Sequence, residues 1–139
     1  MSSIGEIEAR RAERKAKLAA QREEQLAVDI EALDAAELQH GDSNVVRIDV
    51  PYTPGLPTLA LARTPRPVEV KRYRDSVRPK GDKAPDAAAA AEQLAAVCRI
   101  YPDAETLAKM AEARPGLNVQ LGVAAVGLAM GAEAAEGKG

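Results

Sequence analysis

The sequence predicts a mainly helical α+β protein with a long N-terminal helix, one β-hairpin and a C-terminal helical bundle. Residues 4–39 contain no proline and no glycine after Gly5, which permits one long helix. Two short segments of alternating apolar and polar residues follow, and the remainder shows helical apolar patterns separated by prolines. We therefore expect three parts: a charged helix at 1–40, a domain at 45–131 and a flexible tail at 132–139.

The composition indicates a small apolar core. Among the 139 residues, Ala supplies 29 and Leu, Ile and Val together supply 28, and the chain has no Phe or Trp. Because this is close to the composition of disordered proteins, a partner or self-association is a natural way to complete the core. The net charge of −2 gives no global attraction to nucleic acid. A single cysteine excludes an internal disulfide and fits a reducing compartment, and the charged N-terminus does not resemble a signal peptide.

The long N-terminal segment is rich in Ala, Glu, Arg, Lys, Gln and Leu, which lose little rotamer freedom in a helix. Its apolar stripe is interrupted in the first half by Arg11 and Arg14, so this half is expected to be solvated. In the second half, Leu26, Ile30 and Leu33 follow helical spacing and form an apolar face. We expect this face to dock on the domain or to mediate self-association.

Charges in the chain are grouped by sign. Residues 10–22 contain six bases and one acid, residues 23–42 contain seven acids and no base, and residues 63–80 contain seven bases and two acids. Such blocks commonly form solvated faces. Alternatively, the acidic half-helix pairs with a basic block in the same chain or in a neighbouring copy, and salt would then weaken the pairing.

Two strands are predicted after the long helix. Residues 45–50 alternate, with Val46, Ile48 and Val50 on one face. Residues 58–63 alternate again, and the Pro54-Gly55 pair between the two segments is typical of a type II turn. We interpret the two segments as a β-hairpin.

The rest of the chain is predicted to be helical. Pro67 fits the first position of a helix, whereas the Ala run at 87–91 fits either a helix or an extended tether. A further helix places Leu94, Val97, Cys98 and Tyr101 on one face and is ended by Pro102, after which Asp103 caps a short helix. The segment 117–130 is apolar on almost every side, which predicts a buried helix.

No catalytic residue, cofactor site or metal site is predicted. Cys98 lies on an apolar helix face, which is typical of a small buried side chain. The only histidine, His40, lies at the end of another helix, so a Cys/His pair is not expected. No phosphate-binding loop or hydrolase motif is present in the sequence.

Two further features have structural interpretations. Gly127 and Gly131 have the GxxxG spacing of membrane dimers, but the apolar run is only about 14 residues, whereas a span needs about 20. We therefore expect close helix packing in a protein core, with Gly122 near the pair, and no membrane contact. The basic helix at 66–78 contains Tyr73 as its only aromatic residue, so we do not expect it to provide a stacking surface for nucleic acid.

The order of landmarks in residues 45–131 resembles the small tail assembly chaperones of tailed bacteriophages. The segment LARTP at 61–65 closes a strand, and a charged helix follows through 69–74. The segment CRIYP at 98–102 is followed by a short helix, by PGL at 115–117 and by an apolar helix that reaches Gly131. The resemblance rests on this order and spacing, and the charged helix at 1–39 lies outside it.

The resemblance implies a non-enzymatic protein of the bacterial host cytoplasm that keeps the apolar tape-measure protein soluble while tail-tube subunits assemble. A structural or scaffolding component of the virion and a weak nucleic-acid-binding accessory protein are the alternatives. We expect a groove between apolar helices to bind a phage partner such as the tape-measure or tail-tube protein, and we expect no cofactor. Self-association into a homo-oligomer is the alternative use of the apolar helix faces. The residues expected to line this groove are Leu94, Val97, Leu107, Leu117, Leu121 and Leu128.

Overall fold

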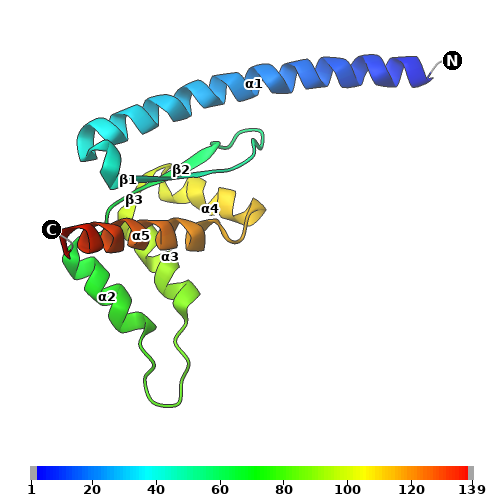
Figure 1. The fold of residues 1–139 in the computed structure, drawn as a ribbon. Helices are drawn as coiled ribbons and strands as arrows, with labels where there is room; N and C mark the ends of the chain where they lie inside the picture. The colour runs from blue at the N-terminus through cyan, green and yellow to red at the C-terminus, as the bar shows by residue number, and fades with distance from the viewer. Residues whose placement is uncertain (1–2, 138–139) are drawn as a thin grey trace.

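The computed structural model describes residues 3–137, with side chains described as far as residue 131. Within these residues the chain forms five α-helices, a short 3₁₀ turn and one three-stranded antiparallel sheet (Figure 1). The predicted α+β class, dominated by helices, is therefore confirmed.

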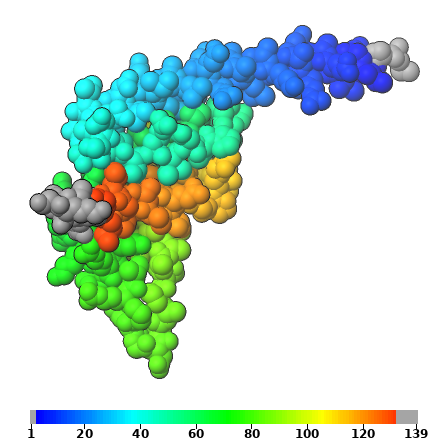
Figure 2. All heavy atoms as spheres, viewed as in Figure 1, coloured from blue at the N-terminus to red at the C-terminus, as the bar shows by residue number. Residues whose placement is uncertain are grey.

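Helix α1 (Ser3–His40) is a single helix of 38 residues, about 57 Å long at 1.5 Å per residue. It ends where Gly41 adopts a φ of 89°, which favours glycine, and donates its backbone N–H to the Glu37 carbonyl at 2.8 Å. Every side chain from residue 3 to residue 20 is exposed. This half, here called the overhang, projects beyond the rest of the molecule (Figure 2).

The sheet contains β1 (Val45–Asp49), β2 (Leu59–Arg63) and β3 (Arg99–Tyr101), with β2 in the centre. Strands β1 and β2 form the predicted hairpin, in which Arg47 lies opposite Leu61. Strand β3 pairs antiparallel with the other edge of β2.

Strand β3 corrects the prediction that one helix continues to Tyr101. Helix α3 (Ala87–Cys98) ends three residues earlier, and the chain becomes extended before Pro102. A proline disfavours helical dihedral angles at the preceding residue, so Tyr101 is displaced towards the extended conformation. The helical spacing of Tyr101 with Val97 and Cys98 is therefore coincidental.

Strand β2 is covered on both faces, which gives the domain three layers. Leu59 and Leu61 face α1, in a small cluster with Ala36. Ala60 and Ala62 face the helices on the opposite side. The main core on that side also contains the buried residues Leu94, Ala95, Cys98, Leu107, Met110, Leu117, Leu121 and Ala125.

Four helices follow the hairpin. Helix α2 (Pro67–Val77) begins at the predicted proline. The Ala run belongs to α3, whose first turn is capped by the Asp86 carboxylate accepting from the Ala89 N–H at 3.0 Å. Asp103 caps α4 (Ala104–Ala113) through the Thr106 N–H at 2.7 Å, as expected.

The last helix, α5 (Leu117–Gly137), lies across α3 and the sheet. It is buried along one side only, because Val123 and Met130 are about half exposed, which corrects the expectation of burial on almost every side. Its backbone extends beyond residue 131, so most of the predicted tail at 132–139 lies in the helix, and residues 138–139 lie outside the described part. No helix in the described residues is both long enough and apolar enough to cross a membrane.

Helices α3 and α5 approach each other closely at Gly122. A Cβ atom placed there would overlap the backbone carbonyl of Ala91, so only glycine permits this crossing. Gly127 and Gly131 have open space around the equivalent position. The expected close packing therefore occurs at Gly122 and not at the GxxxG pair.

Candidate functional site

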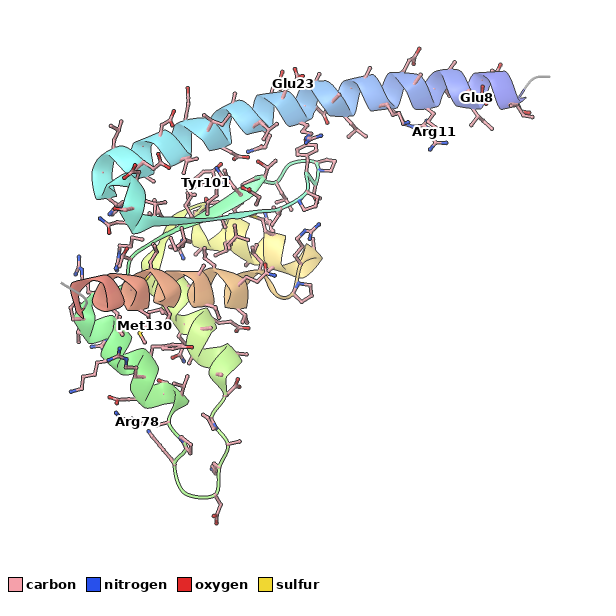
Figure 3. All side chains as sticks on the ribbon, viewed as in Figure 1. Glu8, Arg11, Glu23, Arg78, Tyr101 and Met130 are labelled. Carbon is pink, nitrogen blue, oxygen red and sulfur yellow. The ribbon has the colours of Figure 1, made fainter. Side chains whose placement is uncertain are left out.

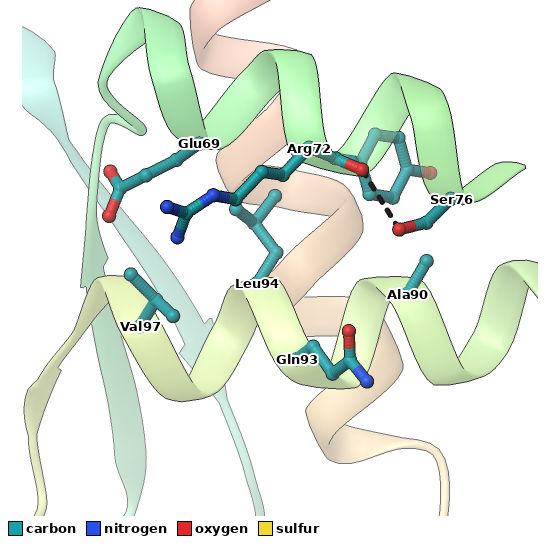
Figure 4. Close-up of a pocket in the computed structure, with 8 residues that line it drawn as sticks. Glu69, Arg72, Ser76, Ala90, Gln93, Leu94 and Val97 are labelled. Atoms are coloured by element: carbon teal, nitrogen blue, oxygen red, sulfur yellow. Dashed lines mark hydrogen bonds between the residues drawn. The ribbon is translucent and has the colours of Figure 1, made fainter.

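A groove of about 160 Å³ lies between α2 and α3 (Figure 4). Helix α2 supplies one wall and helix α3 supplies the other. The lining residues are Glu69, Arg72, Tyr73, Ser76, Ala90, Gln93, Leu94 and Val97.

The groove combines an apolar base with a polar rim. Leu94 is only 5% exposed, whereas Val97, one turn further along α3, is 54% exposed. On the rim, Arg72 and Gln93 are exposed, and the Ser76 hydroxyl donates to the Arg72 backbone carbonyl at 2.8 Å (Figure 4). An apolar surface bordered by polar groups is suited to an apolar side chain of another protein.

An ion pair connects strand β2 to the start of α2. The Arg63 guanidinium donates two hydrogen bonds to the Glu69 carboxylate, at 2.8 and 2.9 Å, and a longer one to the Val97 carbonyl at 3.4 Å. Both charged side chains are largely buried, at 21% and 10% exposure. The hydrogen bonds from Arg63 lower the pKa of Glu69 to about 2, and the backbone N–H of Arg66 contributes in the same direction. This pair fixes α2 relative to α3 at one end of the groove.

A second polar cluster lies between α1 and the sheet, centred on Asp29, which is fully buried. One carboxylate oxygen accepts hydrogen bonds from the Thr58 N–H and hydroxyl, at 2.8 and 2.6 Å. The other accepts from the Gln25 side-chain amide at 3.0 Å and from the Tyr101 hydroxyl at 2.6 Å. Burial, followed by the hydrogen bond to Asp29, raises the pKa of Tyr101. We call this cluster the Asp29 anchor because it attaches α1 to β2 and β3.

Cys98 is fully buried in the main core, which confirms its interpretation as a small buried side chain. Burial raises the pKa of its thiol to about 11, so the thiol is protonated at neutral pH. A protonated and inaccessible thiol is a poor nucleophile and a poor metal ligand.

The structure separates the six residues predicted to line a partner groove. Leu94 and Val97 lie in the groove between α2 and α3. Leu107, Leu117 and Leu121 are at most 5% exposed and belong to the main core, and Leu128 on α5 is half-buried. These last four residues therefore support the helices and do not line the groove.

The three residues predicted for self-association are also separated. Leu26 and Leu33 are half-buried on the side of α1 that faces the domain, and Leu33 packs against the cluster with Leu59 and Leu61. Ile30 is 53% exposed. The second half of α1 therefore docks, as expected, but Ile30 does not share the docked face.

Sequence reasoning did not identify α2 as a wall of the groove. The spacing of Val70, Tyr73 and Val77 is that of an apolar helix face, and Tyr73 lines the groove. The partner of that face was not evident, because α3 follows a loop of nine residues that gives no packing signal.

Within the described residues, no group of three or more His, Cys, Asp or Glu side chains is placed to hold a metal ion. Comparison of the chain with protein-family models, curated proteins and solved structures finds no match.

Proposed function

We propose that this protein is a non-enzymatic chaperone of phage tail assembly, which binds an apolar helical segment of the tape-measure protein. The observation that carries the proposal is the half-exposed Val97 beside the buried Leu94 in the groove between α2 and α3. This groove presents apolar surface to solvent at a position where the domain's own helices leave it uncovered.

The size of the groove supports a protein partner. Small-molecule pockets commonly measure about 300–1,000 Å³, whereas this groove measures about 160 Å³ and is open to solvent. It therefore has room for one or two side chains, which is how an amphipathic helix anchors itself in a groove. The order of landmarks from the LARTP segment to the last apolar helix is the second support for the tail-assembly role.

Co-expression with a phage tape-measure protein tests the proposal. The wild-type chain should increase the soluble fraction of that protein, and Val97→Asp should remove most of the increase because it places a carboxylate in the groove. Val68→Asp is the matched control, since Val68 is also 54% exposed but does not line the groove.

Two results would contradict the proposal. Failure of the wild-type chain to increase solubility would exclude the chaperone role, and equal loss with both variants would exclude the groove as its site. The protein content of purified phage particles distinguishes a chaperone from a structural component of the virion. A chaperone should be absent from the particles, whereas a structural protein should persist in them.

A further inference from the structure

A regular row of charges runs along α1. Arg10, Lys17, Glu24 and Glu31 are seven residues apart, so they lie on one side of the helix. All four side chains are exposed. The row therefore presents two bases in the overhang followed by two acids in the docked half.

The row lies away from the domain. Asp29 and Ala36 mark the side of α1 that is buried against the sheet. At about 100° per residue, the row is rotated by about 80–160° around the helix axis from these two residues. Arg11, in contrast, lies on the domain side of the overhang (Figure 3). The row therefore faces away from the sheet along its whole length.

The order of the charges is self-complementary. We propose that two copies of this chain pair through antiparallel α1 helices, with Arg10 opposite Glu31 and Lys17 opposite Glu24 of the second copy. The twofold symmetry repeats each pair, which gives four ion pairs between the two helices. A parallel arrangement would instead place Arg10 beside Arg10 and Glu24 beside Glu24, so charge selects the antiparallel one.

Apolar and small side chains accompany the charges. Val28 and Leu38, which are 53% and 88% exposed, lie on the side of α1 that carries the row. Ala20 lies at the centre of the proposed overlap and permits close approach of the two helices. The pairing therefore covers apolar surface that the single chain leaves in water.

The domains do not obstruct this arrangement. Each domain lies along the second half of its own α1, and its hairpin loop also reaches Leu18 and Ala19 at the end of the overhang. The antiparallel axis places the two domains at opposite ends of the helix pair. The overhang of each copy then runs beside the docked half of the other. This interface does not include the groove between α2 and α3. The proposed pairing therefore does not depend on the proposed function in tail assembly.

Sedimentation of the full chain across a concentration series tests the pairing. The wild-type chain should form a dimer whose dissociation constant rises with salt. The variant R10E/K17E has four acids in the row, and the variant E24K/E31K has four bases. Every facing pair in either homodimer is then of like charge, so each variant should raise the dissociation constant about tenfold or more. An equimolar mixture of the two variants should recover the dimer, because all four pairs are then of opposite charge.

The control is R11E/K15E, which reverses two bases on the domain side of the overhang and changes the net charge equally. It should leave the dimer largely intact, and circular dichroism should show that every variant retains its helix. A wild-type chain that remains monomeric at every concentration, a mixture that does not pair, or equal weakening by the control would each overturn the proposal.

Discussion

The carboxylate of Asp29 accepts hydrogen bonds from both the backbone N–H and the hydroxyl of Thr58, at 2.8 and 2.6 Å, although the two residues are 29 positions apart. Asp29 belongs to a helix that is otherwise mostly exposed, and Thr58 directly precedes the central strand β2. A buried carboxylate is costly unless its oxygens are fully hydrogen-bonded. The Asp29 anchor meets this condition, and in doing so it determines where α1 crosses the sheet.

Asp29→Ala should lower the free energy of unfolding by about 2–4 kcal/mol, because it leaves the Thr58 and Tyr101 donors without their acceptor. Chemical denaturation followed by circular dichroism measures the change. Asp34→Ala removes an exposed acid from the same helix and should change stability by less than about 0.5 kcal/mol. Equal effects of the two variants would show that the anchor does not stabilise α1.

The Tyr101 hydroxyl should make stability sensitive to alkaline pH. The pKa of Tyr101 is raised by burial and by its hydrogen bond to Asp29, so the folded state favours the neutral phenol. This contribution is complete below the unfolded pKa of about 10 and is lost as the pH rises above it. Denaturation midpoints measured from neutral pH to above 10 should therefore fall, and Tyr101→Phe should flatten the alkaline part of the curve. An unchanged slope in that variant would assign the pH dependence to another group.

Glu69 should have the opposite effect at acidic pH. Hydrogen bonds from Arg63 lower its pKa from an ordinary value of 4.5 to about 2. The resulting stability, about 1–3 kcal/mol, is present above pH 4.5 and is lost as the pH falls towards 2. Glu69→Gln should remove this part of the acid transition when denaturation midpoints are compared across that range.

Arg63→Lys is a useful companion to the Glu69 variant. A lysine keeps the charge but cannot donate the paired hydrogen bonds of a guanidinium. We expect it to retain only part of the acid-dependent stability. Full retention would show that charge alone, and not the two-point geometry, holds α2 at the end of the groove.

Local patterns in the sequence are sufficient to predict most of the secondary structure. The uninterrupted helical composition of residues 4–39 predicted α1, and the alternation around Val46 and Ile48 predicted β1. Pro67 and Asp103 marked the beginnings of two helices. These signals act within one or two turns of the chain, which is why they can be interpreted without the fold.

The remaining features depend on residues that are distant in the sequence. Nothing near Asp29 indicates that Thr58 and Tyr101, which are 29 and 72 positions away, supply its hydrogen bonds. Strand β3 has only three residues, too few for a periodic pattern. The groove likewise depends on which faces of α2 and α3 meet, so helical spacing predicts Val97 as a groove residue but does not predict its companion Tyr73.

The crossing of α3 and α5 gives the sharpest test of the fold, because two glycines in one helix should respond in opposite directions. Gly122→Ala places a methyl group against the backbone carbonyl of Ala91, which cannot move without separating the helices. It should destabilise the protein by about 2–4 kcal/mol. Gly127→Ala has open space at the new Cβ atom and should stabilise the helix by about 0.5–1 kcal/mol. Thermal unfolding of both variants measures the two signs, and a stabilising Gly122→Ala would contradict the close approach of α3 and α5.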